Sequence, residues 1–341
     1  MDMITLFIFI IILIIICFLT KKWANGPLTP IKKDLSGKYI IITGSSDGIG
    51  LETAKDLLKS NAKVIFACRN KTKTELIINN FPENMKKNSF FVQLNLDSFK
   101  SIKNFVKEIK SKFPKIDILI NNAGMSVMSS IYKTEDGFLN SFQVNYLGNV
   151  LLTSLLLDHL NEKEAKVINV SSKAYQRSKL KYGDSKYLNN YDLMFKYFSE
   201  MRNKGAFYSD TKLLLNLFTQ YLASMVEDKY PNMKIFCLHP GVILTNIFTI
   251  KNFVVNIIFK ITFRNIMYLL TKDVVHGAQT TLFLAYSDNK DLVNGGYYNN
   301  FGNEKYTPNA RDEKLRNEMV NETLNILKSH FPELDYLPLS K

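Results

Sequence analysis

Six short apolar runs, separated by amphipathic stretches of helical length, constrain this chain more than any other feature. β-Branched and aromatic residues dominate the runs, as they do in buried strands. Strands that are apolar on both faces and alternate with helices favour a parallel sheet covered by helices on each side. The runs are KYIIITG (38–44), AKVIFAC (62–68), FFVQLN (90–95), IDILINNAG (116–124), AKVINVSS (165–172) and MKIFCLHPG (233–241).

These runs predict one doubly wound α/β domain with a parallel sheet over residues 37–302. GGYYNNF (295–301) is typical of one last strand, and a helix and tail are expected over 303–341. The interval from Ser172 to Tyr208 is long, so residues 173–203 are expected to form an extra loop or short helix.

The amino terminus predicts a single membrane-spanning segment. Residues 3–20 are eighteen uncharged, mostly large apolar residues, which as a helix would span about 27 Å, close to the thickness of a thin bilayer. The acidic Asp2, and TKKWANG without a small-x-small cleavage site, argue against a cleaved signal peptide. We assign residues 1–20 to the anchor and 21–36 to a linker. Lysines after the segment place the rest of the chain in the cytosol by the positive-inside tendency: Lys21, Lys22, Lys32 and Lys33.

Composition narrows the classes of function. The chain has 341 residues, of which 46% are apolar, so it can bury a substantial core. Its net charge of +13 comes from scattered lysines without an arginine-rich run or basic–aromatic cluster, which argues against nucleic acid as a partner. Cys17, Cys68 and Cys237 lie far apart, so neither a disulfide nor a metal site is predicted, and a reducing compartment fits.

TGSSDGIG at 43–50, between the first strand and a helical run, predicts a pyrophosphate site. Its three glycines allow a tight turn, a close approach of the backbone to the anion and close packing of helix on strand. After the second strand, where an NAD-binding protein usually has an acid, this chain has Cys68 and Arg69. A guanidinium can grip a 2′-phosphate with two parallel hydrogen bonds, so NADP(H) is favoured over NAD(H).

Several tyrosines have a lysine four residues later, the spacing that sets a lysine beneath a catalytic tyrosine on a helix. Tyr182 is followed by Gly183 and the turn formers YLNNYD, which do not sustain a helix. Tyr208 instead precedes LLLNLFTQYLASMVEDK, with apolar residues at helical spacing, and lies 32 residues before Pro240. These observations favour Tyr208 and Lys212. The pairs compared are Tyr175/Lys179, Tyr182/Lys186, Tyr208/Lys212, Tyr230/Lys234 and Tyr286/Lys290.

The motifs TGSSDGIG, NNAG (121–124), VNYLGN (144–149), VINVSS (167–172), tyrosine-x-x-x-lysine and HPG (239–241) occur in the order of the short-chain dehydrogenase/reductase family. The chain resembles that family over residues 37–300. ACRN, TEDGFLNSFQVNYLGNVLLTSLLL and HGAQT (276–280) look like its retinol dehydrogenase branch, whose members are membrane-anchored and use NADP(H). The resemblance implies a Rossmann-like fold and allows a homodimer.

The resemblance also implies catalytic roles. In the family a tyrosine exchanges a proton with the substrate oxygen, a serine hydrogen-bonds that oxygen, a lysine holds the nicotinamide ribose and lowers the tyrosine pKa, and an asparagine completes a proton relay. By motif these residues are Tyr208, Ser172, Lys212 and Asn145. Ser171 neighbours Ser172 on a strand and faces the other way, so a buried hydroxyl bonded to backbone is expected there.

A further set is expected to contact the cofactor. Thr245 is expected to bond the carboxamide. Asn95 stands where the family often has an adenine-contacting aspartate, and its amide can still form that bond. The whole expected set is Gly44, Ser45, Ser46, Asp47, Gly48, Ile49, Gly50, Arg69, Asn95, Leu96, Asn122, Ala123, Gly124, Tyr208, Lys212, Pro240, Gly241 and Thr245.

The segment IFTIKNFVVNIIFKITFRNIMYLL (247–270) bears on the substrate. In this fold it forms the substrate lid, so an apolar lid implies a lipophilic alcohol or carbonyl, and its basic residues suit a face over 246–270 that rests on the bilayer. An ordinary core helix is the alternative.

We therefore expect a membrane oxidoreductase of retinol/retinal-like substrates, in the endoplasmic reticulum and facing the cytosol. The alternatives are a reductase of polyprenoid, sterol or other lipid carbonyls and a catalytically idle NADP-binding scaffold or sensor.

Overall fold

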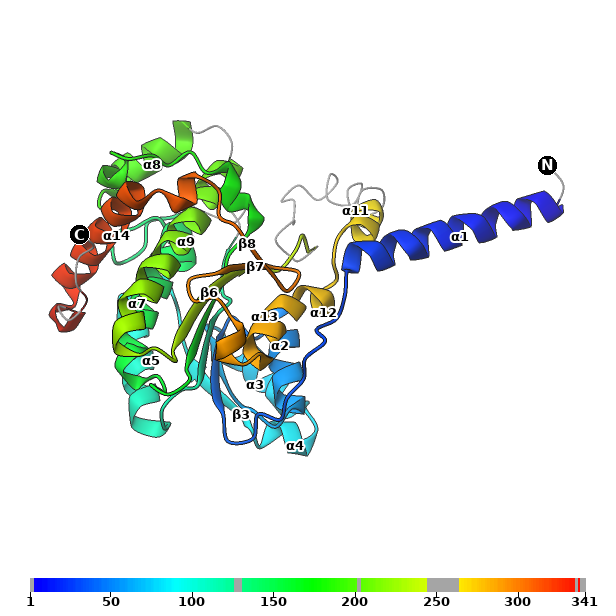
Figure 1. Cartoon of the computed structure of the whole chain (residues 1–341), viewed down its shortest axis with the longest axis horizontal. Coiled ribbons are helices and arrows are strands. Elements are labelled where there is room, and N and C mark those ends of the chain that lie inside the picture. Colours follow the sequence, from blue (N-terminus) through cyan, green and yellow to red (C-terminus); the bar gives the residue numbers. More distant parts are fainter. Residues whose placement is uncertain (1–2, 126–130, 201–203, 244–263, 335–336, 338–341) are drawn as a thin grey trace.

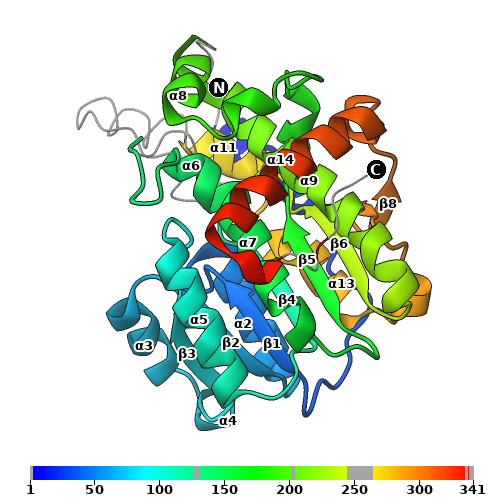
Figure 2. The same ribbon diagram turned by 90° about the vertical axis from the view of Figure 1, so that its left-hand side faces the viewer.

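An eight-stranded sheet forms the centre of the protein (Figure 1, Figure 2). The computed structural model describes residues 3–125, 131–200, 204–243, 264–334 and 337. The strands follow the order β3–β2–β1–β4–β5–β6–β7–β8, and neighbours are parallel except β7 and β8. This confirms the predicted doubly wound sheet, to which β8 adds an unpredicted edge strand. The strands are β1 (Tyr39–Thr43), β2 (Lys63–Cys68), β3 (Ser89–Gln93), β4 (Ile118–Asn121), β5 (Lys166–Val170), β6 (Lys234–His239), β7 (Tyr297–Asn299) and β8 (Gly302–Glu304).

Helices cover both faces of the sheet (Figure 1, Figure 2). One layer holds α2 (Gly48–Lys59), α3 (Lys71–Asn79), α12 (Val274–Gly277) and α13 (Gln279–Tyr286). The other holds α5 (Phe99–Lys112), α7 (Gly148–Leu156), α9 (Lys204–Lys229) and α14 (Glu313–His330). Shorter described helices are α4 (Glu83–Lys86), α6 (Asn140–Phe142), α8 (Tyr191–Glu200) and α11 (Arg264–Leu270).

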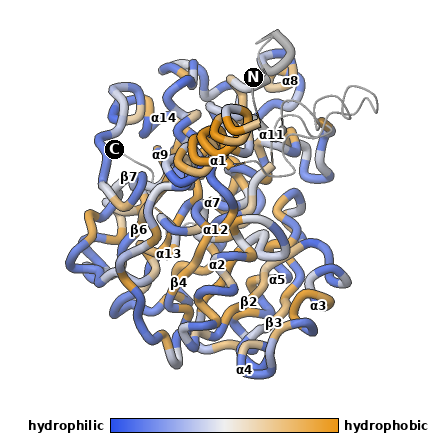
Figure 3. Tube along the Cα trace, turned by 90° about the vertical axis from the view of Figure 1, so that its right-hand side faces the viewer, coloured by the Kyte–Doolittle hydropathy of each residue, from blue (hydrophilic) through white to orange (hydrophobic). Residues whose placement is uncertain are grey.

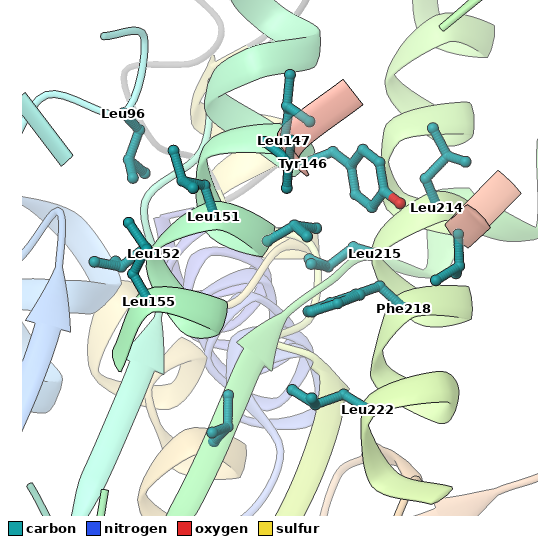
Figure 4. Packing of buried hydrophobic residues seen from close by; sticks show 14 of the residues in the cluster. Leu96, Tyr146, Leu147, Leu151, Leu152, Leu155, Leu214, Leu215, Phe218 and Leu222 are labelled. Atoms are coloured by element: carbon teal, nitrogen blue, oxygen red, sulfur yellow. The ribbon is translucent and has the colours of Figure 1, made fainter. Parts of the chain in front are cut away.

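The core has two halves, one on each face of the sheet. Side chains alternate between faces along a strand, so Ile41 joins the half beneath α5, α7 and α9, while Ile40 and Ile42 join the half beneath α2 and α13. All three are fully buried, which explains why the strands are apolar without alternation. Figure 4 shows part of the half beneath α5, α7 and α9, with Leu151 and Leu155 of α7 and Leu215 and Phe218 of α9 among its buried side chains.

Helix α1 (Met3–Asn25) projects from the domain as an apolar rod (Figure 1, Figure 3). Its mean hydropathy reaches 3.3 and its apolar window is entirely unburied within the molecule, so among the described residues it is the one helix long and apolar enough to cross a membrane. It continues five residues beyond the predicted anchor. The following residues run along the α2 and α13 layer, where the Thr29 amide donates to Gln279 Oε1 (2.9 Å) and the Leu35 amide to Ser60 O (2.7 Å).

Two leucines of the α2 and α3 layer test how much this packing contributes to stability. Leu57 is fully buried, whereas Leu76 is 59% exposed. We expect Leu57→Ala to lower the free energy of unfolding by about 2–5 kcal/mol, because it removes buried apolar surface and leaves a cavity. Leu76→Ala should stay within about 0.5 kcal/mol of the wild type. Urea unfolding of both full-length variants in the same detergent measures the difference, and equal losses would contradict this account of the core.

Candidate active site

A cavity of about 880 Å³ opens at the carboxyl ends of the central strands, where the strand order reverses between β1 and β4. This is where doubly wound sheets bind their ligands. Twelve of the predicted cofactor-contacting residues line it: Gly44, Ser46, Asp47, Gly48, Ile49, Gly50, Arg69, Asn95, Leu96, Asn122, Ala123 and Gly124.

The glycine loop has the geometry that its sequence requires. Gly44 and Gly48 have φ of +67° and +54°, a left-handed conformation that side chains disfavour. Gly50 has no room for a side chain, because a Cβ there would lie 2.4 Å from Asn122 Nδ2 and 2.6 Å from Gly44 O. Asp47 caps α2 by accepting a hydrogen bond from the Gly48 amide (2.8 Å).

Two cationic side chains line the cavity near the end of β2 and the start of α3. Arg69 follows β2, and Lys73 lies in the first turn of α3. Lys73 Nζ donates to Asp47 Oδ2 (2.8 Å), and this bond holds the pKa of the Asp47 carboxyl below its usual value. Asn70 caps α3 by accepting from the Lys73 amide (2.9 Å). The acidic charge of the glycine loop is thus balanced by Lys73.

Five predicted residues are not among those that line the cavity, and a sixth lies outside the described residues. Ser45 is fully buried and its hydroxyl donates to Ile42 O (3.0 Å), so it supports the turn from inside the core. Pro240 and Gly241 follow β6, beyond the cavity lining. Tyr208 and Lys212 lie in a neighbouring cluster with Asn145 and Ser172. Thr245 belongs to the stretch 244–263, which is not described.

Lys212 and Asn145 lie next to the cavity, behind its lining residue Gly124. Lys212 is 4% exposed and its Nζ donates to Val170 O (2.9 Å). Burial lowers the pKa of Lys212 to about 8. Asn145, in the π-helical turn Gln143–Leu147, accepts from the Met125 amide (2.7 Å) and donates to Met125 O (2.9 Å). A Cβ added to Gly124 would lie 3.4 Å from Asn145 Oδ1 and 3.6 Å from Lys212 Nζ, so both polar groups converge on that glycine.

Tyr208 and Ser172 meet above Lys212. Tyr208 lies one helical turn before Lys212 on α9, and the Lys212 Nζ is 5.7 Å from the centre of its ring. Burial raises the pKa of Tyr208, and a hydrogen bond with the Ser172 side chain acts in the opposite direction. Ser171 is buried and its hydroxyl donates to Lys212 O (3.4 Å), as expected of a hydroxyl on the other face.

The other four tyrosines occupy different surroundings. Tyr182 is 67% exposed. Tyr175 is buried against the rings of Tyr297 and Tyr306. Tyr286 donates to Asp56 Oδ1 (2.6 Å) and so joins α13 to α2. Tyr230 lies after α9, where Lys229 Nζ is 5.1 Å from its ring centre.

The insertion between Ser172 and Tyr208 is attached to the catalytic helix itself. Asp210 of α9 is buried and accepts hydrogen bonds from Ser178 Oγ (2.6 Å), the Lys179 amide (3.1 Å) and Tyr197 OH (3.3 Å). Burial raises the pKa of Asp210 to about 6. The described part of the insertion consists of 3₁₀ turns at Lys173–Arg177 and Ser185–Tyr187, followed by α8.

Several residues that line the cavity were missed by sequence reasoning. Lys73 carried a readable signal, because it lies four residues after Arg69 on a predicted helix. Asp97 and Tyr132 carried none, since their hydrogen bond (2.5 Å) joins segments 35 residues apart. The missed residues are Thr43, Ala67, Asn70, Lys73, Leu94, Asp97, Met125, Tyr132, Val144 and Val274.

Sequence comparisons identify related proteins. The short chain dehydrogenase family profile matches residues 38–186. Retinol dehydrogenase 14 of Homo sapiens is 33% identical over 84% of each chain. Retinol dehydrogenase 13 of Homo sapiens is 31% identical over 95% of this chain and 94% of its own. Polyprenol dehydrogenase of Homo sapiens is 30% identical over 90% of each.

A structural comparison agrees at the level of fold. Salutaridine reductase from Papaver somniferum superposes with a TM-score of 0.56 at 20% identity, covering 76% of this chain and 99% of its own. The family profile covers the glycine loop and strands β1 to β5, and the relatives at 30% identity or more extend over 84% to 95% of this chain. This chain therefore belongs to the short-chain dehydrogenase/reductase family, in its retinol dehydrogenase branch.

Proposed function

We propose that this protein is a membrane-anchored, NADP(H)-dependent oxidoreductase that interconverts a lipophilic alcohol and its aldehyde or ketone, chiefly in the reductive direction. The observation that carries the proposal is the cluster of Asn145, Ser172, Tyr208 and Lys212 beside the cavity at the strand ends, in which Asn145 and Lys212 are buried. Such a cluster holds an acid, a hydrogen-bond donor for the substrate oxygen and a cation in one place.

The residues around the cavity fit a nicotinamide dinucleotide. Gly44 and Gly48 leave the backbone open to a pyrophosphate at the N-terminus of α2. Arg69, with Lys73 nearby, suits a 2′-phosphate, and the acidic Asp47 is neutralised by Lys73. A blue fluorescent protein from a metagenomic library, which has the same fold (17% identity, TM-score 0.56), was solved in complex with NADPH. These features support NADP(H) over NAD(H).

The bound cofactor supplies or accepts a hydride at the substrate carbon. The chain then supplies the proton: Tyr208 gives its phenolic proton to the substrate oxygen in reduction and takes it back in oxidation. Burial raises the pKa of Tyr208 and so keeps it protonated at neutral pH, which suits the reductive direction. Ser172 is positioned to hydrogen-bond the same oxygen, and Lys212 is charged below a pKa of about 8.

The apolar helix α1 and the names of the relatives both support a lipophilic substrate. Helix α1 would hold the domain at a bilayer where lipophilic substrates concentrate, with the catalytic domain in the cytosol. Most of the expected lipid-facing stretch 246–270 lies outside the described residues. Retinol is the substrate in the names of two relatives and polyprenol in that of a third. A retinal-like aldehyde is the first candidate and a polyprenoid carbonyl the second. A catalytically idle NADP-binding protein is disfavoured because Asn145 and Lys212 converge on Gly124, Lys212 Nζ lies 5.7 Å from the centre of the Tyr208 ring, and Tyr208 is hydrogen-bonded to Ser172.

The tyrosine assignment is tested by a pair of phenylalanine variants. We expect Tyr208→Phe to lower kcat with NADPH and retinal by roughly 10²- to 10⁴-fold, because the proton donor is lost. The exposed Tyr182→Phe should keep wild-type activity. NADPH oxidation by both full-length variants in detergent is measured against a panel of retinoid, sterol and polyprenoid carbonyls. Activity that survives in Tyr208→Phe and disappears in Tyr182→Phe would overturn the assignment.

The cofactor assignment is tested at Arg69. We expect Arg69→Ala to weaken NADPH binding by roughly 10- to 100-fold, because a charge-assisted bond to the 2′-phosphate is lost, and to leave NADH binding nearly unchanged. Quenching of NADPH and NADH fluorescence on titration measures both affinities. Arg177→Ala, which removes an arginine from a 3₁₀ turn outside the cavity lining, is the control. Equal losses for both cofactors would contradict the role of Arg69.

The lysine gives the reaction a pH dependence with a definite sign. Burial lowers the pKa of Lys212 to about 8, so its ammonium is present below that pH and is lost above it. We expect kcat/KM for NADPH in the reductive direction to fall about tenfold per pH unit above the pKa, because this quantity reports groups of the free enzyme. A profile that stays flat through about pH 10 would mean that the charge of Lys212 is not needed.

A further inference from the structure

The end of the anchor helix is joined to the catalytic domain by a charged contact. Lys21 Nζ donates to Tyr268 O (2.8 Å) and to Thr271 O (2.8 Å), at and just after the end of α11. The same ammonium lies 3.9 Å from the centre of the Tyr268 ring. Cations suit the carboxyl ends of helices, where carbonyl groups lack partners, so Lys21 both satisfies these carbonyls and stabilises α11.

One turn further along α1, Asn25 forms a reciprocal pair with Asp273. Its Nδ2 donates to Asp273 Oδ2 (3.0 Å), and its Oδ1 accepts from the Asp273 amide (3.1 Å). Two bonds between one amide side chain and one residue fix both the position and the rotation of Asp273 relative to α1. The two contacts lie on one helix face because Lys21 and Asn25 are four residues apart.

Asp273 in turn holds the helix that lines the cofactor cavity. Asp273 caps α12 by accepting from the His276 amide (2.8 Å). Val274, the first residue of α12, lines the cavity. At the other end of α12, a Cβ on Gly277 would lie 2.5 Å from Ile243 Cδ1 and 3.4 Å from Ile49 Cγ1, so α12 packs directly against the glycine loop.

The residue before Asp273 connects to the loop after β6. The Lys272 amide donates to Val242 O (2.8 Å). The Lys272 side chain lies so close to Gly241 that a Cβ there would be 2.6 Å from its Cδ, and its Nζ donates to Asn300 Oδ1 (2.7 Å). Residues 271–274 therefore contact the anchor on one side. On the other side they contact the loop after β6 and line the cavity.

We propose that Lys21 and Asn25 of the anchor are positioning residues of the cofactor site, acting through Asp273 and α12. Helix α12 has four residues and cannot hold its own conformation, so its place depends on its cap and on its neighbours. The anchor contact fixes that cap. The anchor is then a working part of the catalytic domain as well as its attachment to the membrane. This inference rests on the proposed NADP(H) function, because its test measures NADPH binding. The contacts of Lys21 and Asn25 with the domain do not depend on that function.

Adjacent lysines on α1 provide a matched test. Lys21 contacts α11, whereas Lys22 is exposed and its side chain forms no hydrogen bond or ion pair with the described residues. Lys21→Met and Lys22→Met remove the same charge from the same turn, so they change attraction to lipid headgroups equally. Asn25→Ala removes the second contact. All are made in the full-length chain, in nanodiscs of one phospholipid composition.

Two measurements are made on each variant. NADPH affinity is measured by fluorescence titration, and amide hydrogen exchange is followed over residues 267–277 without cofactor. We expect Lys21→Met and Asn25→Ala to exchange faster over that stretch and to bind NADPH roughly three- to tenfold more weakly, while Lys22→Met matches the wild type in both. A lower kcat/KM with an unchanged Tm would accompany the weaker binding.

The outcomes separate the two proposals. If all four proteins exchange alike over residues 267–277 and bind NADPH alike, the positioning role is overturned while the NADP(H) function stands. If exchange rises in Lys21→Met alone among the lysine variants but NADPH affinity is unchanged, the contact exists without the positioning role, which also overturns the inference. If the wild type binds neither NADPH nor NADP⁺, the proposed function fails, and the exchange data still report on the contact.

Discussion

The parallel pairing of β1 with β4 is the constraint on which the rest of the structure depends. Ile40 to Ile42 pair in register with Ile118 to Ile120, although the strands are 78 residues apart at that point and β2 and β3 intervene in the chain. The pairing brings the start of the glycine loop against NNAG, where the Ala123 amide donates to Thr43 Oγ1 (2.9 Å) and Asn122 Nδ2 to Thr43 O (2.9 Å). The crevice for the cofactor exists because helices leave the sheet in opposite directions at this pair.

Two buried lysines show that a lowered pKa does not by itself identify a residue of the candidate site. The groups that each ammonium contacts must also be considered. Lys166 and Lys212 are both buried lysines whose pKa burial lowers to about 8. Lys166 donates to three carbonyl groups at the end of α13, so all its hydrogens are used within the scaffold. Lys212 donates to Val170 O and otherwise faces Tyr208 and Gly124, where a substrate or ribose hydroxyl could be bound. The lowered pKa of a lysine is therefore weaker evidence of function than the direction in which its ammonium points.

Two acidic residues, Asp210 and Asp273, connect outer segments of the chain to the elements around the candidate site. On one side Asp210 binds the inserted segment to the helix of Tyr208 through Ser178, Lys179 and Tyr197. On the other side Asp273 links α1 to α12. Both connections run through an acidic side chain, and apolar side chains of the inserted segment such as Leu180 and Met194 also pack into the core.

The sequence by itself determined the elements and the chemistry that depend on near neighbours in the chain. Apolar runs specified the six central strands, glycine spacing specified the tight turn between β1 and α2, and helical periodicity favoured Tyr208 and Lys212 over four similar pairs. These features are readable because strand alternation, glycine conformations and helical spacing are local properties. The tertiary structure alone decided the inward turn of Ser45, the pairing of Asp97 with Tyr132 and the contact of Lys21 with Tyr268. The last joins residues 247 positions apart, and no local pattern encodes which distant carbonyl a lysine will reach, because that depends on how the whole sheet and its helices pack.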